Sequence, residues 1–386
     1  MDGKQQEKMA KESFGKYQHY LRQRPVKLTL LSILAVVFFL VVTGLSRVHD
    51  AQRQALGNRW FNRGVTDLKA QHYKAAVQEF RAALLYSRDN YQYQFNLAEA
   101  LIGTKNTGEA SAYLMNLWDR EPEDGLVNLE LARIAAQRGQ IEQAVRYYHD
   151  AVYAAWPSDK ETTRRDARFE LIELLLRTNA IPQAQIELLA LAENVDDPSQ
   201  QERIGDLFLK AQDYEHAMTA YRSSLRADRH NEPALAGAGY AAFQLGRYPA
   251  AEKYLQAAVA GSPKDTQSAD LLNTTELVLH LDPYQRGIST AERNRRAIEA
   301  FEDAGQRLKS CAIPKATPGG SPTSLNEDWN SMKPRVTAAG LRRDPDLVDS
   351  AMDLTFRIER QASVACGSPT GKDLALLLIA KLHEGN

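Results

Sequence analysis

The pattern of apolar and polar positions changes twice along this chain. Residues 1–27 are polar without a hydrophobic period, and residues 28–45, "LTLLSILAVVFFLVVTGL", form an uninterrupted uncharged run. From residue 57 to residue 264, short segments with apolar residues at helical spacing alternate with polar turns. The pattern predicts a largely disordered tail at 1–27, an apolar helix at 28–45 and then many short amphipathic helices. Residues 46–56 are expected to be a short linker or the start of a helix that continues from the apolar run.

The apolar run has the length of a membrane span. A helix of about 20 apolar residues crosses a hydrocarbon core about 30 Å thick. A cleaved signal peptide is the alternative, but its apolar region is usually about 7–15 residues long. No clear Ala-x-Ala cleavage site follows Leu45. We therefore expect a single-pass transmembrane helix at 28–45.

Basic residues flank this run unequally. The side chains before it are Lys4, Lys8, Lys11, Lys16, Arg22, Arg24 and Lys27, and those after it are Arg47, Arg53, Arg59 and Arg63. Cytoplasmic flanks of membrane helices are enriched in Lys and Arg. The bias predicts a cytoplasmic tail at 1–27 and an extracytoplasmic C-terminal part, held at the cytoplasmic (inner) membrane.

The amphipathic helices contain a repeated unit. The segment "LGRYPAAEKYLQAAVAGSP" at 245–263 shares its pattern with "QHYKAAVQEFRAALL" at 71–85. Aligned on one alanine, the units give Ala76, Ala110, Ala144, Ala184, Ala217 and Ala251, spaced by 34, 34, 40, 33 and 34 residues. Small residues in the preceding helices, Gly64, Ala98, Ala132, Gly205 and Gly239, are expected to face these alanines so that two helices cross closely.

This unit resembles the tetratricopeptide repeat, whose period is 34 residues. The resemblance implies an all-α, right-handed solenoid of helix-turn-helix units, similar to bacterial membrane-anchored members of that family. The array covers 57–264. Its six units are placed at about 57–90, 91–124, 125–158, 165–197, 198–231 and 232–264, with an extra segment before the fourth.

The resemblance also implies a binding surface. In this family the first helix of each hairpin lines the concave side, and such a groove holds an extended peptide or a partner helix. Carried onto this sequence, the groove residues are Phe61, Val65, Lys69, Phe95, Glu99, Arg133, Gln137, Phe169, Glu173, Arg177, Asp206, Lys210, Tyr240 and Gln244. Aromatic side chains are expected to act as anchors, and charged ones to set the register.

Residues after the array are expected to cap it. Capping helices are predicted at 265–311, where Ser289 and Glu292 have the spacing of a capping box. Apolar Ile298, Phe301 and Leu308 form the inner face of one helix, which leaves Arg293, Arg295 and Arg296 mostly on its solvated outer face or in its first turn. The alternative is that the three arginines form a site for a phosphate, a nucleic acid or an acidic partner. A Pro/Gly/Ser loop at 312–325 and a helical segment at 326–386 follow, with a helix starting at Asp344-Pro345.

The two cysteines, Cys311 and Cys366, each end a predicted helix. In an oxidising compartment a disulfide between them would close a loop of about 55 residues. The alternative is two unrelated buried thiols. Their separation excludes a CxxC redox motif.

No motif indicates catalysis. The sequence contains no HExxH, phosphate-binding loop, G-x-S-x-G or acidic calcium loop, so we expect no catalytic residue, metal or cofactor. A net charge of −1 argues against nucleic-acid binding. The leading hypothesis is a non-enzymatic scaffold that holds a protein partner in an envelope assembly, secretion or maturation complex.

Two other functions compete with the scaffold. One is a permanent structural subunit of a large membrane complex. The other is a repeat-bearing enzyme such as a glycosyltransferase, which is disfavoured because only about 120 residues of helical pattern follow the array, and a sugar-nucleotide domain needs alternating strands.

Overall fold

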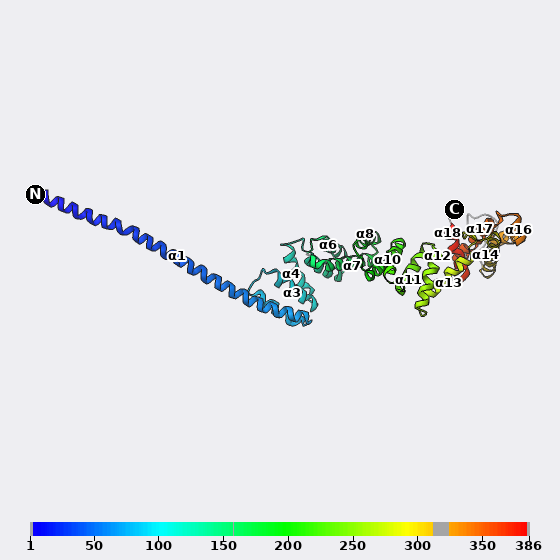
Figure 1. Cartoon of the computed structure of the whole chain (residues 1–386), viewed down its shortest axis with the longest axis horizontal. Coiled ribbons are helices and arrows are strands. Elements are labelled where there is room, and N and C mark those ends of the chain that lie inside the picture. Colours follow the sequence, from blue (N-terminus) through cyan, green and yellow to red (C-terminus); the bar gives the residue numbers. More distant parts are fainter. Residues whose placement is uncertain (1–2, 157, 312–323, 384–386) are drawn as a thin grey trace. The chain divides into compact units, whose positions relative to one another are not determined.

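The computed structural model describes residues 3–156, 158–311 and 324–383. Throughout these ranges the secondary structure is helical (Figure 1). The chain forms two compact units, residues 1–167 and 168–386, so the boundary lies inside the repeat array. It falls where the sequence carries the extra segment before the fourth repeat. The predicted loop at 312–325 lies outside the described residues up to residue 323.

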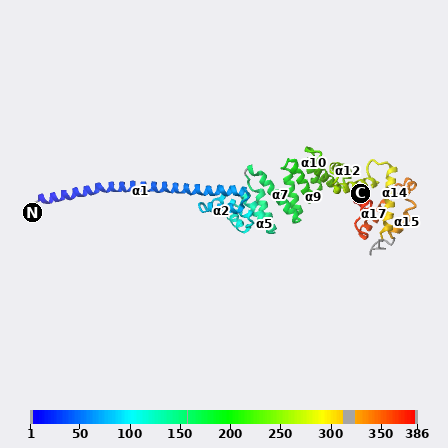
Figure 2. The same cartoon turned by 90° about the horizontal axis from the view of Figure 1, so that it is seen from below.

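Helix α1 (Gly3–Lys69) is one continuous element, drawn in blue in Figures 1 and 2. The expected disorder is therefore wrong for residues 3–27, and of the two expectations for 46–56 the linker is wrong and the continuing helix is confirmed. The segment "SRVHDAQRQAL" at 46–56 contains neither glycine nor proline, so nothing in it ends a helix. The apolar stretch of α1 is exposed, with Leu30 at 66% and Phe38 at 69%.

Within the first unit, three helical hairpins stack in chain order. The C-terminal part of α1 packs on α2, α3 on α4, and α5 on α6. The bounds are α2 (Tyr73–Leu84), α3 (Tyr91–Gly103), α4 (Thr107–Trp118), α5 (Gly125–Gln137), α6 (Ile141–Tyr153) and a 3-10 turn η1 (Ser158–Lys160).

The second unit holds three more hairpins and a C-terminal cap, defined as residues 265–383. Helix α7 (Glu161–Arg177) begins before the unit boundary, and the remaining hairpin helices are α8 (Ile181–Ala192), α9 (Pro198–Lys210), α10 (Tyr214–Ala227), α11 (Glu232–Gln244) and α12 (Tyr248–Gly261). The cap contains α13 (Thr266–Leu281), α14 (Thr290–Ser310), α15 (Leu325–Met332), α16 (Ala338–Arg343), α17 (Leu347–Ala365) and α18 (Gly371–His383).

The turn inside each hairpin has one conformation. One residue per turn has a positive φ, between 58° and 73°, and it lies five positions before the repeat alanine. Only glycine adopts this region without steric cost. The six residues are Gln71, Lys105, Gly139, Asn179, Gln212 and Gly246. Two of them are glycine, so the other four turns are held in place by the packing of their helices.

The close helix crossing depends on a small residue against a large one. A Cβ added to Gly64 would lie 2.6 Å from the ring of Phe80, and one added to Gly205 would lie 2.8 Å from Tyr221. Phe80 and Tyr221 each stand four residues after the repeat alanine and are fully buried. The small residue thus makes room mainly for this large side chain, a contact that the expected pairing with alanine did not include.

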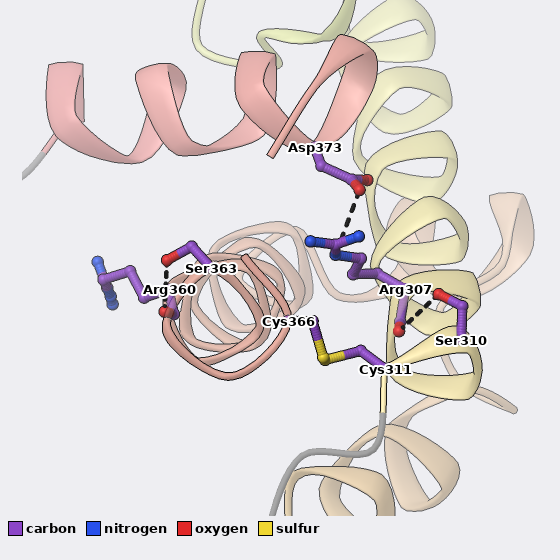
Figure 3. Close-up of a disulfide and its surroundings, with 7 residues drawn as sticks. All are labelled: Arg307, Ser310, Cys311, Arg360, Ser363, Cys366 and Asp373. Atoms are coloured by element: carbon purple, nitrogen blue, oxygen red, sulfur yellow. Dashed lines mark hydrogen bonds and ion pairs between the residues drawn. A yellow bond between two sulfur atoms is a disulfide. The ribbon is translucent and has the colours of Figure 1, made fainter. Parts of the chain in front are cut away.

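The cap has its own apolar core, which extends to Tyr248 of the last repeat. Trp329 of α15 stacks on Phe301 of α14, donates from Nε1 to the Phe301 carbonyl at 3.1 Å, and lies against Gly305. A disulfide joins Cys311 to Cys366, with their Cα atoms 5.9 Å apart, and so ties the ends of α14 and α17 together (Figure 3).

One of the three arginines expected on the solvated face of α14 is placed differently. The side chain of Arg296 is only 11% exposed, and its Nη1 donates to the carbonyls of Leu279 at 2.7 Å and Asp282 at 3.0 Å. Carbonyls at the end of a helix have no intrahelical partner, and α13 ends at Leu281. The outward assignment of Arg296 is therefore wrong, because the end of α13 needs its donors.

Two expected helix starts also differ in detail. Ser289 caps α14 by accepting from the Glu292 backbone N–H at 3.2 Å, while the Glu292 carboxylate accepts from Arg295 and Arg296. The helix predicted to start at Asp344-Pro345 begins at Leu347. Asp344 instead ends α16, which the sequence pattern did not separate from α17.

Candidate functional site

The first helices of the repeats start with a recurrent cap. At four of these starts, and at the start of α13 in the cap, an Asn or Asp side chain accepts from backbone N–H groups of the first turn, which satisfies donors that would otherwise lack a partner. These residues are Asn90, Asp124, Asp197, Asn231 and Asp265. Because most are 34 residues apart, equivalent positions of successive first helices are presented in register.

The predicted groove residues divide into three groups by exposure. Half-buried members are Phe61, Val65, Glu99 and Tyr240. Exposed members are Lys69, Arg133, Gln137, Glu173, Arg177, Asp206, Lys210 and Gln244. These twelve side chains are accessible in the folded chain.

The remaining two, Phe95 and Phe169, are buried, with exposures of 7% and 2%. Phe95 stacks on Tyr91 at 5.9 Å, and Phe169 lies under the guanidinium of Arg203 at 4.1 Å. Their assignment as partner anchors is wrong, because burying a large aromatic ring in the core is more favourable than leaving it on an open face.

In the first unit, two predicted residues line one pocket of about 360 Å³. Its lining residues come from three successive repeats and are Leu68, Lys69, Gln71, Tyr73, Glu99, Ile102, Gly103 and Glu130. Arg133 pairs with Glu130 at 2.5 Å across its rim. The pocket therefore offers an apolar floor with both signs of charge around it.

Glu99 is the residue of this pocket whose pKa is shifted most clearly from its usual value. Burial and then the neighbouring Glu130 raise the pKa of Glu99 from 4.5 to about 7, while Arg133 and Lys160 oppose the rise. A carboxyl group with this pKa changes charge near neutrality. It can donate a hydrogen bond when protonated and attract a cation when ionised.

In the second unit, two other predicted residues line a pocket of about 280 Å³. Its lining residues are Asp206, Leu209, Tyr221, Pro233, Ala236, Gly237, Tyr240, Asp265, Gln267, Ser268 and Leu271. The Tyr221 hydroxyl donates to Asp206 at 2.5 Å. Hydrogen bonds from Ser268 lower the pKa of Asp265 and keep it ionised. This pocket combines two carboxylates with the Tyr240 ring and has no basic lining residue.

Several residues that line these pockets lie outside the predicted groove. Glu130 and Asp265 are absent from the predicted groove, although the 34-residue spacing of the helix caps could have pointed to Asp265. Two further pockets lie at turns of the first unit. One, of about 580 Å³, includes Tyr73 and Lys105, and another, of about 620 Å³, includes Gly125, Trp156 and Lys160.

The described residues offer no evident metal site. Across 3–156, 158–311 and 324–383, no three His, Cys, Asp or Glu side chains are grouped to hold a metal ion. The accessible chemistry of the first-helix faces is therefore that of hydrogen bonds, ion pairs and apolar contacts.

Comparison with known proteins agrees with the repeat geometry. The family model described as tetratricopeptide repeat matches residues 61–125 and 203–266. No curated protein matches the chain significantly.

Several solved structures are similar at low identity. A structure from a functional characterisation of Pseudomonas aeruginosa pilF is 16% identical, with a TM-score of 0.41, and the match covers 56% of this chain and 97% of that one. The C-terminal part of a repeat-containing protein from Cytophaga hutchinsonii is 13% identical, with a TM-score of 0.43 and coverages of 82% and 99%. PilW, described as a type IV pilus biogenesis factor, is 15% identical, with a TM-score of 0.39 and coverages of 57% and 98%.

The repeat assignment rests on the sequence of this chain and its own geometry. The alanine period, the six left-handed hairpin turns and the two segments that match the family model agree with one another. The chain is an all-α helical-repeat protein that carries tetratricopeptide repeats, which the family model matches at residues 61–125 and 203–266.

Proposed function

We propose that this chain is a membrane-anchored scaffold that binds a protein partner through the first-helix faces of its repeats. The observation that carries the proposal is the continuity of α1. One helix contains both an exposed apolar stretch, with a mean hydropathy of 2.5 over its best window, and the first helix of the first hairpin. The repeats are thus attached to the apolar stretch without an intervening loop.

The accessible side chains support a protein partner. Tetratricopeptide repeats use such faces for extended peptides and helices. Here the faces offer the half-buried rings of Phe61 and Tyr240 and a series of charged side chains, including Lys69, Arg133 and Asp206. Rings of this kind suit apolar anchors of a partner, and charged residues fix its register.

Photocrosslinking in cells tests the binding face. A photoreactive residue at position 133 on α5 is compared with one at position 146 on α6, since both replace an exposed arginine of the same hairpin. We expect partner crosslinks from 133 and none from 146. Equal yields, or none from any exposed first-helix position, would contradict the proposal. A single stoichiometric complex that resists dissociation would favour a permanent structural subunit.

We also propose that α1 crosses the inner membrane with its N-terminus inside and the repeats outside the cytoplasm. The basic tail and the disulfide between Cys311 and Cys366 support this topology, because disulfides persist in oxidising compartments. A cysteine introduced at Lys105 should react with an impermeant maleimide on intact spheroplasts, whereas one introduced at Gln6 should react only after permeabilisation. The reverse pattern would overturn the topology.

A further inference from the structure

The cap contains a buried carboxyl group without a partner. Glu359 lies on the inner face of α17 with 1% of its surface exposed, and neither carboxylate oxygen has a hydrogen-bond partner among the residues that the structure describes. A buried carboxylate without donors is costly when ionised and much less costly when protonated. Glu359 is therefore a group whose charge state affects how the cap packs.

Charged groups from two neighbouring helices surround Glu359. Helix α14 contributes Asp303 and Arg307, and α18 contributes Asp373. Arg307 Nε faces Asp373 Oδ2 at 3.3 Å (Figure 3), and Lys372 Nζ donates to Asp303 Oδ2 at 2.9 Å. Both nearby cations are thus engaged by other carboxylates, so neither of them pairs with Glu359.

The other helices packed on α17 add no compensating charge. Asp328 of α15 is paired with Arg357 at 3.2 Å, and the charged residues of α16, Arg342 and Arg343, are exposed. Burial and then Asp373 raise the pKa of Glu359 from 4.5 to about 8, against the opposing effect of Arg307.

The sign of the pH dependence follows from this shift. Between about pH 4.5 and about pH 8 the folded cap retains a proton on Glu359 that an unfolded chain would release. The stability of the cap is therefore greatest below this window, falls as the pH rises through it, and levels off above it.

The disulfide holds α14 and α17 together but does not hold α18. It joins the end of α14 to the end of α17, so these two helices stay together. Helix α18 follows Cys366 through a short segment flanked by Gly367 and Gly371, which have positive φ values of 88° and 56°. Asp373 stands in the first turn of α18, so repulsion between it and an ionised Glu359 acts on a helix that the disulfide does not hold. Helix α18 is held instead by its packing on α13, α14 and α17 and by the ion pairs of Lys372 and His383.

We propose that Glu359 is a proton-operated latch for α18. While Glu359 is protonated, α18 stays closed on α14 and α17; when Glu359 ionises, α18 is released. Release uncovers the apolar side chains that α18 now buries with the cap, including Leu376 and Ile379, and it exposes Val278 and Leu281 in the same core. This regulation of the cap goes beyond the proposed scaffold function and does not depend on the identity of a partner.

Hydrogen exchange on the full chain in detergent micelles tests the latch. Between about pH 6 and about pH 9, after correction for intrinsic exchange rates, protection of the α18 amides should fall at least about tenfold, while the α17 amides stay protected. Glu359→Gln should remove this pH dependence. Asp353→Asn is the matched control, because Asp353 is an exposed carboxylate on the same helix, and it should behave like the wild type.

Two results would overturn the latch. The first is an unchanged pH profile in Glu359→Gln, and the second is loss of α17 protection together with α18 while the disulfide is intact. If Glu359→Gln does not fold, Asp373→Asn provides the test, since it removes the repelling carboxylate and frees Arg307 to pair with Glu359. Its pH-dependent loss of protection should be smaller than that of the wild type, and an equal loss would exclude the proposal.

Discussion

The repeats and the C-terminal cap hold their helices together in different ways. In the repeats the same contact recurs, in which a small residue of one helix accepts a large side chain such as Phe80 or Tyr221. In the cap each contact occurs once: the disulfide, the Trp329 ring against Gly305, and Arg296 on the end of α13. Damage to one contact should therefore stay local in the repeats, whereas the loss of a single residue can destabilise the whole cap.

The largest loss of stability should come from removing the large side chain of a repeat contact. Phe80→Ala removes a fully buried ring and should reduce the free energy of unfolding of the first unit by about 3–5 kcal/mol. Since repeats contact only their neighbours, hydrogen exchange should show lost protection in α1 to α4 and an unchanged cap. Leu85→Ala, at a site 73% exposed, is the control. Loss of protection in the cap would show that the two regions are not independent.

Removal of the disulfide should destabilise the C-terminal cap and not the repeats. Cys311→Ser combined with Cys366→Ser opens a link across a separation of 55 residues and should destabilise the cap by about 4 kcal/mol in the chain-entropy model. Hydrogen exchange of the α14 and α17 amides in rising denaturant measures the cap, and the first unit should unfold as before. Ser363→Ala near the disulfide should change little. An unchanged denaturation midpoint of the cap would mean that its apolar core alone holds α14 and α17 together.

Arg296 should prove important although its neighbours on α14 are not. Arg296→Gln leaves the carbonyls of Leu279 and Asp282 without this donor and should cost about 2 kcal/mol of cap stability. Arg295→Gln is the matched control, because Arg295 is an exposed arginine one position earlier. Thermal unfolding of both variants gives the comparison, and equal shifts would contradict the buried role of Arg296.

The smallest expected effect is a gain in the stability of the first unit. Lys105→Gly relieves a side chain held at a φ of 65° and should stabilise the first unit by about 1 kcal/mol. Gly139→Lys, at the equivalent turn of the next hairpin with a φ of 73°, should destabilise it by a similar amount. Urea unfolding measures both, and changes of the same sign would show that these turns are not governed by backbone strain.

The sequence predicted the repeated part of the fold more completely than its accessible surface. The alanine period identifies six hairpins, because every crossing needs a small residue at the same phase. The alanine period does not predict which groove side chains are exposed. Phe95 and Phe169 occupy groove positions of the family pattern but are buried, since their surroundings include Tyr91 and Arg203, which the period does not specify.

The remaining differences between the expected and the observed structure lie in segments without a sequence repeat. The helical class, the hairpin period, the apolar stretch and the apolar face of α14 can be read from the sequence, since each depends on local spacing along one helix. The inward turn of Arg296, the start of α17 at Leu347 and the burial of Glu359 beside Asp373 are seen only in the folded chain. These features depend on groups distant in the chain, and the cost of burying a charge or an unpaired carbonyl is set by the groups that come to lie around it.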